Sequence, residues 1–181
     1  MIYLVRHAHS DWSPDENRPL SAKGHADAQR VADVLAPYSI VAIYSSPYTR
    51  ARQTVEPLAA RLGLPITEDR QLRERQLSSE PLADFLESVK MLWANPTFAF
   101  EGGESNVEAQ QRGVTLLYDL RDRHRNENIV LATHGNLLAL MLQHFGKTID
   151  IEFWQKMSMP DVYSLSFWMP LGHMIQRLWN E

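Results

Sequence analysis

The sequence predicts an α/β fold, a three-layer α/β/α sandwich with a mostly parallel central sheet and an antiparallel C-terminal strand. Three continuous apolar runs, residues 1–5 (MIYLV), 40–44 (IVAIY) and 129–132 (IVLA), have the length and composition of strands buried on both faces. Segments with helical periodicity separate them, and strands that alternate with helices are typical of a parallel sheet covered by helices. Near the C-terminus, alternating polar and apolar residues indicate an antiparallel strand pair.

The first helix is expected after a polar loop that includes residues 17–20. Ser21 is a good N-cap because its hydroxyl can accept from a free backbone N–H, and the helix is expected to continue to about residue 35. Its apolar positions fall on one face: Ala28, Val31, Ala32 and Leu35.

The second helix is expected over residues 47–62. Gly63 is its predicted stop, and Pro57 predicts a kink because proline cannot donate an intrahelical hydrogen bond. Residues 64–67 predict a short strand near the edge of the sheet, where Pro65 is tolerated.

The middle of the chain predicts an insertion built on one helix. Residues 81–95 are helical in character and Pro96 ends them, whereas residues 102–103 (GG) predict a turn. Ser105 begins a further helix, whose apolar positions include Val107, Val114 and Leu117. We expect residues 76–105 to form a lid-like insertion over the candidate site described below.

The last third of the chain predicts one more helix and the antiparallel pair. The strand at residues 129–132 is expected to lead into a helix over residues 136–145. In residues 162–167, side chains alternate between two faces, so we expect a strand pair that ends near Trp179.

Composition limits the classes of function. With 181 residues the chain is long enough for one domain (1–181) with a sizeable core. Its net charge of −4 argues against a nucleic-acid partner, and the absence of cysteine excludes disulfides and thiolate chemistry. Apolar runs are far shorter than about 18 residues and the N-terminus lacks a signal-peptide pattern, so we expect no membrane partner and a cytoplasmic location.

Four charged or titratable residues are expected at strand ends on one edge of the sheet. Arg6 and His7 follow the first strand, Arg50 lies close after the second, and His134 follows the third. Two guanidiniums and two imidazoles that face one crevice need a dianionic ligand, since otherwise their positive charges repel. A phosphoryl group fits, because arginine binds its oxygens in a bidentate manner.

At this point the chain resembles the histidine phosphatase superfamily, also called the phosphoglycerate mutase-like family, as a short phosphatase-type member. Six ordered motifs along nearly the whole chain carry the resemblance: LVRHA (4–8), LSAKG (20–24), SSPYTRARQT (45–54), LRE (72–74), GGES (102–105) and THGN (133–136).

The resemblance implies a catalytic role for five residues. His7 is the expected nucleophile and takes the phosphoryl group as a phosphohistidine. Arg6, Arg50 and His134 are expected to hold the phosphoryl oxygens through transfer. Glu74 is the expected proton donor to the leaving group. The two arginines neutralise the phosphoryl charge, so the reaction is expected to need neither a metal nor another cofactor.

The chain departs from the family pattern around the proton donor and in the first loop. Residues 75–80 (RQLSSE) replace a segment with glycine and tryptophan, which makes Glu80 the alternative acid. Ala8 stands where glycine is commonest, and His9 and Ser13 replace an acidic or amide pair.

Further residues are candidates for the substrate pocket. Ser10 is expected to donate to a phosphate oxygen, and the lining candidates are Asn17, Arg18 and Glu104. Trp12 and Trp93 are the tryptophans expected to touch the substrate.

A metal site is the alternative interpretation of the histidines His7, His9, His134 and His144. Arginines beside two of the imidazoles make a cation there unfavourable, so we predict no metal. His25, His124 and His173 are expected on the surface, and Arg52 is expected to be solvated.

These features predict a metal-independent phosphatase that hydrolyses a small phosphorylated metabolite, as a monomer or a homodimer. Three alternatives remain: a phosphoglycerate mutase, a protein phosphatase that acts on phosphohistidine, and a non-catalytic phosphate-binding module. The intact set of four predicted phosphoryl-binding residues argues against the last of these.

Overall fold

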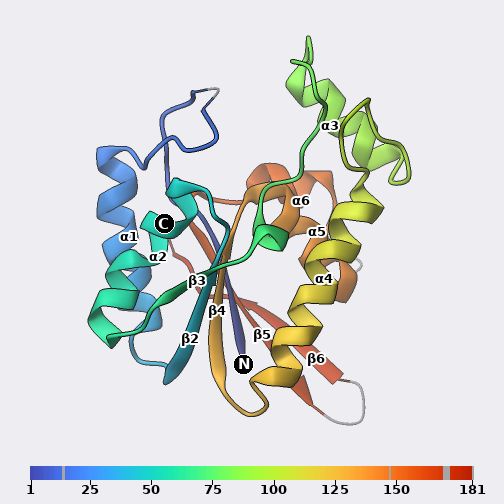
Figure 1. The fold of residues 1–181 in the computed structure, drawn as a ribbon. Coiled ribbons are helices and arrows are strands. Elements are labelled where there is room, and N and C mark those ends of the chain that lie inside the picture. Colours follow the sequence, from blue (N-terminus) through green and yellow to red (C-terminus); the bar gives the residue numbers. More distant parts are fainter. Residues whose placement is uncertain (14, 147, 169–171, 181) are drawn as a thin grey trace.

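A six-stranded mixed sheet forms the centre of the molecule in the computed structural model, which describes residues 1–13, 15–146, 148–168 and 172–180 (Figure 1). The strand order is β3-β2-β4-β1-β5-β6. Neighbouring pairs among the first four strands in that order are parallel, whereas β5 is antiparallel to both β1 and β6. The strands are β1 (Ile2–Arg6), β2 (Ile40–Ser45), β3 (Ile66–Glu68), β4 (Asn128–Thr133), β5 (Asp161–Trp168) and β6 (Gly172–Arg177).

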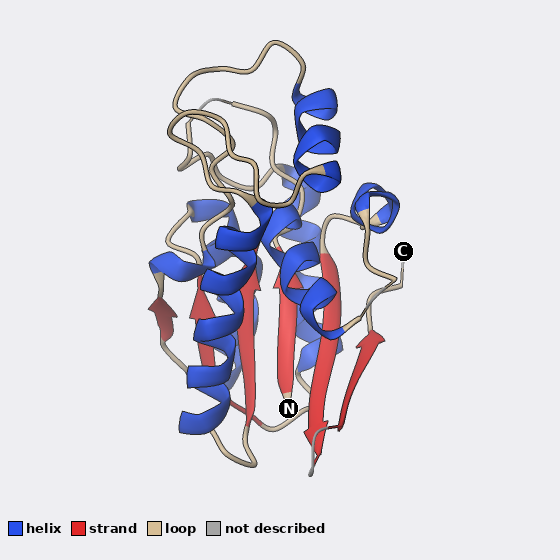
Figure 2. Ribbon diagram, turned by 90° about the vertical axis from the view of Figure 1, so that its right-hand side faces the viewer, coloured by secondary structure: helices blue, strands red, loops and turns tan. Residues whose placement is uncertain are grey.

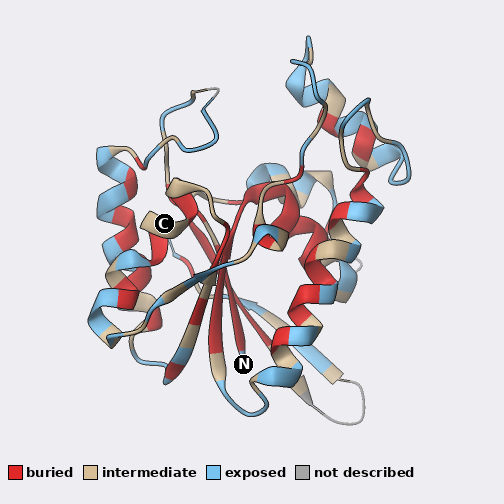
Figure 3. Cartoon of the chain, in the orientation of Figure 1, coloured by how far each residue is buried: buried red, intermediate tan, exposed pale blue. Residues whose placement is uncertain are grey.

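Helices cover both faces of this sheet, so the predicted three-layer sandwich is confirmed. α1 (Ala22–Leu35) and α2 (Thr49–Leu62) lie on one face, and α4 (Asn106–Arg123) and α5 (Gly135–Phe145) lie on the other (Figures 1 and 3). Tyr3 and Val5 of β1 pack with the first pair, whereas Ile2 and Leu4 pack with the second. Alternate side chains of β1 therefore enter two separate cores, which explains why residues 2–5 are all apolar.

The predicted ends of the first two helices are confirmed. Ser21 caps α1, where its hydroxyl oxygen accepts from the backbone N–H of Gly24 at 3.1 Å. Gly63 ends α2 with a φ of +65°, a left-handed conformation that glycine adopts without strain. β3 lies at the edge of the sheet, as the nearby proline predicted.

The segment between β3 and α4 extends past the carboxyl ends of the strands (Figures 1 and 2). It contains the 3-10 turn η1 (Arg70–Leu72) and the helix α3 (Phe85–Ala94), which is shorter than predicted because Asp84 caps it by accepting from the backbone of Glu87. The predicted glycine turn is confirmed: Gly102 has a φ of +68°, and a Cβ on Gly103 would lie 2.0 Å from the carbonyl oxygen of Leu77.

Two features differ from the prediction. A short helix, α6 (Ile151–Lys156), was not foreseen, because one and a half turns are too few to show a helical period. Val107 was expected in the core but is 44% exposed, since it lies in the first turn of α4, at the lid end of that helix. None of the helices in the described ranges combines the length and apolar character that crossing a bilayer demands.

Candidate active site

The candidate site lies at the carboxyl ends of β1 and β4, beside β2. Arg6 at the end of β1 pairs in register with Thr133 at the end of β4. The backbone N–H of His7 donates to the carbonyl oxygen of Thr133 at 3.0 Å, which continues the parallel ladder by one residue. His7 and His134 therefore follow adjacent strand ends, and their rings meet edge to face with centroids 5.1 Å apart.

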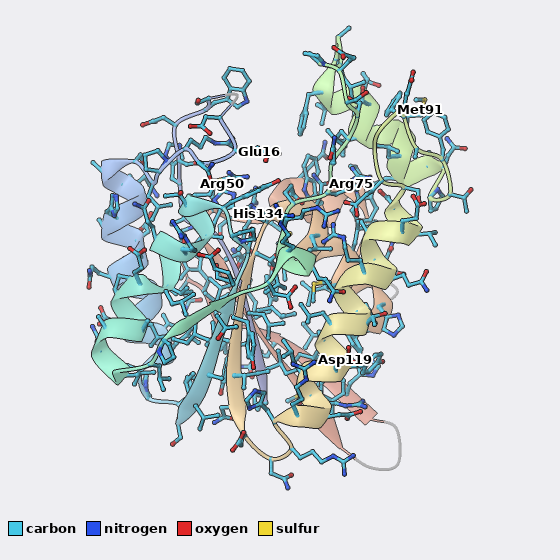
Figure 4. The ribbon with its side chains drawn as sticks, viewed as in Figure 1. Glu16, Arg50, Arg75, Met91, Asp119 and His134 are labelled. Atoms are coloured by element: carbon cyan, nitrogen blue, oxygen red, sulfur yellow. The ribbon has the colours of Figure 1, made fainter. Side chains whose placement is uncertain are left out.

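Arg50 reaches the same place from the first turn of α2. Its side chain is almost completely buried, and its Nε donates to Nε2 of His7 at 3.3 Å. Figure 4 shows Arg50 and His134 close together above the sheet. The structure thus brings together four residues predicted to act on a phosphoryl group, Arg6, His7, Arg50 and His134, which we call the cradle.

The ring of His7 is held in one orientation and one tautomer. Its Nδ1 lies 2.7 Å from the carbonyl oxygen of Ala8, which can only accept, so Nδ1 carries the proton. Burial and, to a smaller extent, the nearby cations of Arg50, Arg6 and Arg18 lower the pKa of His7 to about 3, whereas the Ala8 carbonyl acts in the opposite direction. His7 is therefore neutral at pH 7, with the lone pair on Nε2.

Arg6 is oriented by a loop that precedes β5. Its Nη1 donates to the carbonyl oxygens of Met157 at 2.8 Å and Ser158 at 3.1 Å. The guanidinium packs against Gly135, where a Cβ would lie 3.0 Å from Nη2. Nε is buried without a partner among the described residues, so this N–H is free for a ligand.

Asp161, fully buried at the start of β5, fixes that loop in turn. Its carboxylate accepts from the backbone N–H of Ser158 at 3.2 Å, from Nε of Arg177 at 2.8 Å and from the hydroxyl of Tyr163 at 2.9 Å. The position of Arg6 therefore depends on a buried carboxylate outside the cradle.

His134 is fully buried as the N-cap residue of α5. Its Nε2 lies 2.8 Å from Oγ of Ser46, and the ring of Tyr48 meets it edge to face at 5.1 Å. Burial lowers the pKa of His134 well below its ordinary value, and the neighbouring His7 and Arg50 act in the same direction. This imidazole is also neutral at pH 7.

Arg18 adds a third guanidinium to the two in the cradle. Its Nε donates to Oγ of Ser10 at 3.3 Å, and its Nη1 donates to the carbonyl oxygen of Ser13 at 3.0 Å. Its charge helps to lower the pKa of His7, His134 and Arg50. The structure therefore places Arg18 near the cradle, with Ser10 beside it.

Glu16 lies over the cradle from the first loop, which joins β1 to α1 and is described at residues 7–13 and 15–21. Its carbonyl oxygen accepts from Nη1 of Arg50 at 2.7 Å, and Figure 4 shows Glu16 above Arg50. Burial and the interaction with the Glu16 carboxylate together raise the pKa of Tyr48 to about 12. Burial and the charge of Arg18 lower the pKa of Arg50 to about 10, yet Arg50 stays a cation at pH 7.

Glu74 lies at the N-terminus of α5. Its carboxylate accepts from the backbone N–H groups of Arg75 at 2.9 Å, Leu137 at 3.0 Å and Asn136 at 3.1 Å. Two of these donors belong to the first turn of the helix, where a negative charge is stabilised. Glu74 also acts electrostatically on Arg6 and Arg50, which places it beside the cradle.

Glu104 makes an ion pair at the base of the lid segment (residues 76–105). Its two oxygens accept from Nε and Nη2 of Arg112, each at 2.8 Å, and Arg73 approaches at 3.3 Å. The carboxylate therefore ties α4 to the segment before the lid, and a pocket role for it stays a prediction.

Arg75 is a buried cation that sequence reasoning did not single out. One of its N–H groups donates to the side chain of Asn106, whereas Nε and Nη2 have no partner among the described residues. Burial lowers its pKa, and Glu74 and Glu104 oppose that effect. Figure 4 shows Arg75 on the side of His134 that faces α3.

Other candidates lie farther from the cradle or in solvent. Asn17 and Glu80 are exposed, and Trp12 is 83% exposed on the first loop. Trp93 instead packs against the core beneath α4 and α5. Their predicted contacts with substrate stay predictions.

The remaining histidines have protein partners or face solvent. His9 bonds Oγ of Ser21 at 2.8 Å and thereby ties the first loop to α1. His144 contacts the hydroxyl of Tyr118 at 3.1 Å, and His25 and His173 are exposed as predicted. In the parts of the chain that the structure describes, no three His, Cys, Asp or Glu side chains gather in the way a metal site needs.

Several contributors to the site were not foreseen. Thr54 accepts from the backbone N–H of Ala8 at 2.9 Å and donates to the carbonyl oxygen of Arg50 at 2.7 Å, which joins β1 to α2. Ser46 and Tyr48 contact His134. All three belong to the motif at residues 45–54, so membership of that motif was the sequence feature that could have predicted their role in the site.

Comparison with known proteins shows the family of this chain. The family model of the histidine phosphatase superfamily (branch 1) matches residues 2–170. This chain belongs to that superfamily. The phosphoglycerate mutase-like protein 4 of Arabidopsis thaliana is 32% identical over 159 residues, which cover 78% of this chain and 69% of the relative. A probable phosphoglycerate mutase of Shigella dysenteriae is 30% identical over 155 residues, covering 78% and 72%.

Solved structures with a similar fold include a mycobacterial glucosyl-3-phosphoglycerate phosphatase. It superposes with a TM-score of 0.79 at 23% identity, covering 97% of this chain and 96% of that one. At this identity the likeness shows the shared fold.

Proposed function

We propose that this histidine phosphatase superfamily member hydrolyses a small phosphomonoester, without a metal, through a phosphohistidine on His7. The observation that carries the proposal is the state of the His7 ring. Its Nδ1–H is fixed by the Ala8 carbonyl, and its neutral Nε2 lies beside the Nε of Arg50. A neutral imidazole with an oriented lone pair is what attack on phosphorus requires.

In the first step, the Nε2 lone pair of His7 attacks phosphorus, and the bond between phosphorus and the leaving oxygen breaks. Arg6, Arg50 and Arg18 counter the charge on the phosphoryl oxygens. Glu74, in its protonated form, gives its proton to the leaving oxygen. Its position beside the cradle supports this role, and its hydrogen bonds to the start of α5 hold the side chain there.

In the second step, a water oxygen attacks phosphorus and the bond to Nε2 breaks. The Glu74 carboxylate takes the proton of that water, and inorganic phosphate leaves. The acid is thereby restored, and His7 regains its lone pair, so the cycle closes without an external reductant, oxidant or metal.

Hydrolysis is favoured over mutase transfer by the surroundings of the cradle. A mutase must keep its phosphoryl group from water until the product is formed. Here the first loop, whose Glu16 lies above Arg50, exposes Trp12, Glu16 and Asn17, and the lid segment exposes Phe85. The relatives named as mutases keep phosphoglycerate mutase-type transfer as the second candidate.

The predicted partner remains a small phosphorylated metabolite. We propose that the lid segment, which extends past the strand ends in Figures 1 and 2, contributes to the choice of that substrate. Its helix α3 favours a small molecule over a phosphorylated protein, because it would obstruct the approach of a folded partner.

The test is hydrolysis of an aryl phosphate in the presence of a chelator, with and without vanadate, by the wild type and by His7→Ala. We expect activity that persists with chelator, is inhibited by vanadate and falls by at least about a thousandfold in His7→Ala. Activity that is lost with chelator would contradict the metal-free mechanism, and unchanged activity in His7→Ala would exclude the nucleophile. Rapid formation of a phosphorylated second product from a bisphosphate would favour the mutase.

A further inference from the structure

His134 of the cradle is neutral, so whether it can donate a hydrogen bond to a ligand depends on which ring nitrogen carries the proton. A neutral imidazole donates from one nitrogen and accepts at the other. If His134 is to bind a phosphoryl oxygen, the nitrogen that faces this oxygen must carry the hydrogen. The hydrogen bond made by the other nitrogen decides which tautomer forms.

Ser46 makes that other hydrogen bond. Its Oγ lies 2.8 Å from Nε2 of His134, and both side chains are fully buried. The same oxygen accepts the backbone N–H of Tyr48 at 3.3 Å. An oxygen that already receives one N–H can still donate its own O–H, and the Nε2 lone pair of His134 lies in reach.

Nδ1 of His134 has no partner in the part of the chain that the structure describes, although it is buried. A buried polar atom without a partner is costly unless a ligand completes it. Around it stand the cations that would attract an anion: the charges of Arg50, Arg18 and Arg6 all act on this ring. An Nδ1 with a proton suits an anionic ligand, whereas a bare lone pair would repel one.

We propose that Ser46 is a positioning residue whose hydroxyl donates to Nε2 of His134 and thereby places the ring proton on Nδ1. This makes neutral His134 a hydrogen-bond donor to a phosphoryl oxygen, while the arginines supply the charge. His7 is set in the same way by the Ala8 carbonyl, with the same nitrogen protonated. His7 thus presents a lone pair to the ligand and His134 presents a hydrogen. In each ring a neighbouring group of the protein fixes the tautomer.

The expected effect on kcat rests on the proposed function, whereas the expected tautomer of His134 does not. The direct readout is the ¹⁵N spectrum of the histidine side chains near neutral pH, in which protonated and unprotonated ring nitrogens are well separated. We expect His134 of the wild type to show a protonated Nδ1 and an unprotonated Nε2. Addition of inorganic phosphate should then shift the Nδ1–H signal of His134. A protonated Nε2 in the wild type would overturn the proposal.

Ser46→Ala removes the donor, and Ser45→Ala is the matched control. Ser45 is equally buried and also loses one hydrogen bond, from its Oγ to the Ser46 carbonyl oxygen at 2.8 Å, without touching His134. We expect Ser46→Ala to lose the single Nδ1–H tautomer and to lower kcat by about tenfold or more, with a smaller change in KM. Ser45→Ala should keep the tautomer and most of kcat.

Ser46→Thr retains a hydroxyl and should restore the tautomer. If Ser46→Ala keeps a pure Nδ1–H tautomer, or loses no more kcat than Ser45→Ala, Ser46 does not set the state of His134. If the wild type releases no phosphate from any phosphomonoester, the proposed function fails, yet the spectrum still decides the tautomer. The two failures are therefore distinguishable.

Discussion

The cradle and the two segments that border it are built in opposite ways. His7, Arg50 and His134 are each no more than 6% exposed, and they follow or adjoin strands that pair in register. The first loop and the lid segment lie beyond the sheet and expose large apolar side chains, Trp12 at 83% and Phe85 at 55%. The cradle is fixed by the sheet, whereas the first loop and the lid segment expose large apolar side chains to solvent.

This difference indicates where chemistry and specificity reside. The cradle is positioned by backbone ladders and by buried partners such as Asp161, so its geometry follows from the fold. Residues on a rigid sheet edge hold reacting groups well, and exposed segments can vary without loss of the fold. We therefore expect substitutions in the cradle to reduce catalysis on every substrate and substitutions in the exposed segments to change the choice of substrate.

The largest effect is expected for Arg50→Ala. Loss of a buried cation that stabilises phosphoryl charge should reduce kcat/KM for an aryl phosphate by about 10²–10³-fold. Arg52→Ala is the matched control on the same helix, because Arg52 pairs with Glu68 at 2.7 Å at the surface. Steady-state kinetics should show a control close to wild type; equal losses in both variants would contradict a special role for Arg50.

A smaller and substrate-dependent effect is expected for Glu74→Gln. Without a proton donor, hydrolysis of an alkyl phosphate, which has a poor leaving group, should slow by about 100-fold, and hydrolysis of a nitrophenyl phosphate should change far less. The measurement is kcat for both substrates. Glu80→Gln is the control, and a leaving-group dependence that appears in Glu80→Gln instead would move the role of the acid to Glu80.

Acid should destabilise the cradle through His7. Its pKa is near 3 in the folded protein and 6.5 as the ordinary value, so the unfolded chain binds the proton more readily. The contribution of His7 to the free energy of unfolding is therefore constant above about pH 6.5. Below that pH the free energy of unfolding falls by on the order of 1 kcal/mol per pH unit because of His7.

Urea unfolding at about pH 7.5 and about pH 5.5 tests this expectation. The free energy of unfolding should fall more for the wild type than for His7→Gln, which has no titrating ring. His25→Gln, at an exposed position, should follow the wild type. A His7→Gln protein with the same pH dependence as the wild type would show that His7 is not a buried neutral imidazole.

The smallest effects are expected in the exposed segments. Trp12→Ala and Phe85→Ala should each change the free energy of unfolding by less than about 0.5 kcal/mol, because few contacts are lost. Their effect on a small aryl phosphate should be within about threefold, whereas the ranking of larger phosphomonoesters should change. A uniform loss of kcat on all substrates would show that these segments support the cradle after all.

The features that could be predicted from the sequence are those that depend on a local residue pattern. Apolar runs located the strands, and Ser21 and Gly63 marked helix ends, because each signal acts within a few residues. The cradle was predictable because the carboxyl ends of parallel strands meet at one sheet edge, which brings Arg6 and His134 together. The family motifs then supplied the roles.

What escaped prediction depends on contacts between distant segments. Glu74 was foreseen as an acid, but two of its three backbone hydrogen bonds arise only when its loop meets the start of α5. Arg75 gives no sign in the sequence that it is buried. The exposure of Val107 depends on where α4 extends past its neighbours, which its own periodicity cannot show.

The central claim is that the phosphoryl group passes through His7, and trapping the phosphoenzyme tests it most directly. Wild-type protein mixed with a labelled aryl phosphate and quenched rapidly should carry the label on His7, stable to alkali and lost in acid, as a phosphorus–nitrogen bond requires. His7→Ala, shown to be folded, should carry none. A label on another residue, or full turnover with no trapped label and an active His7→Ala, would contradict the account.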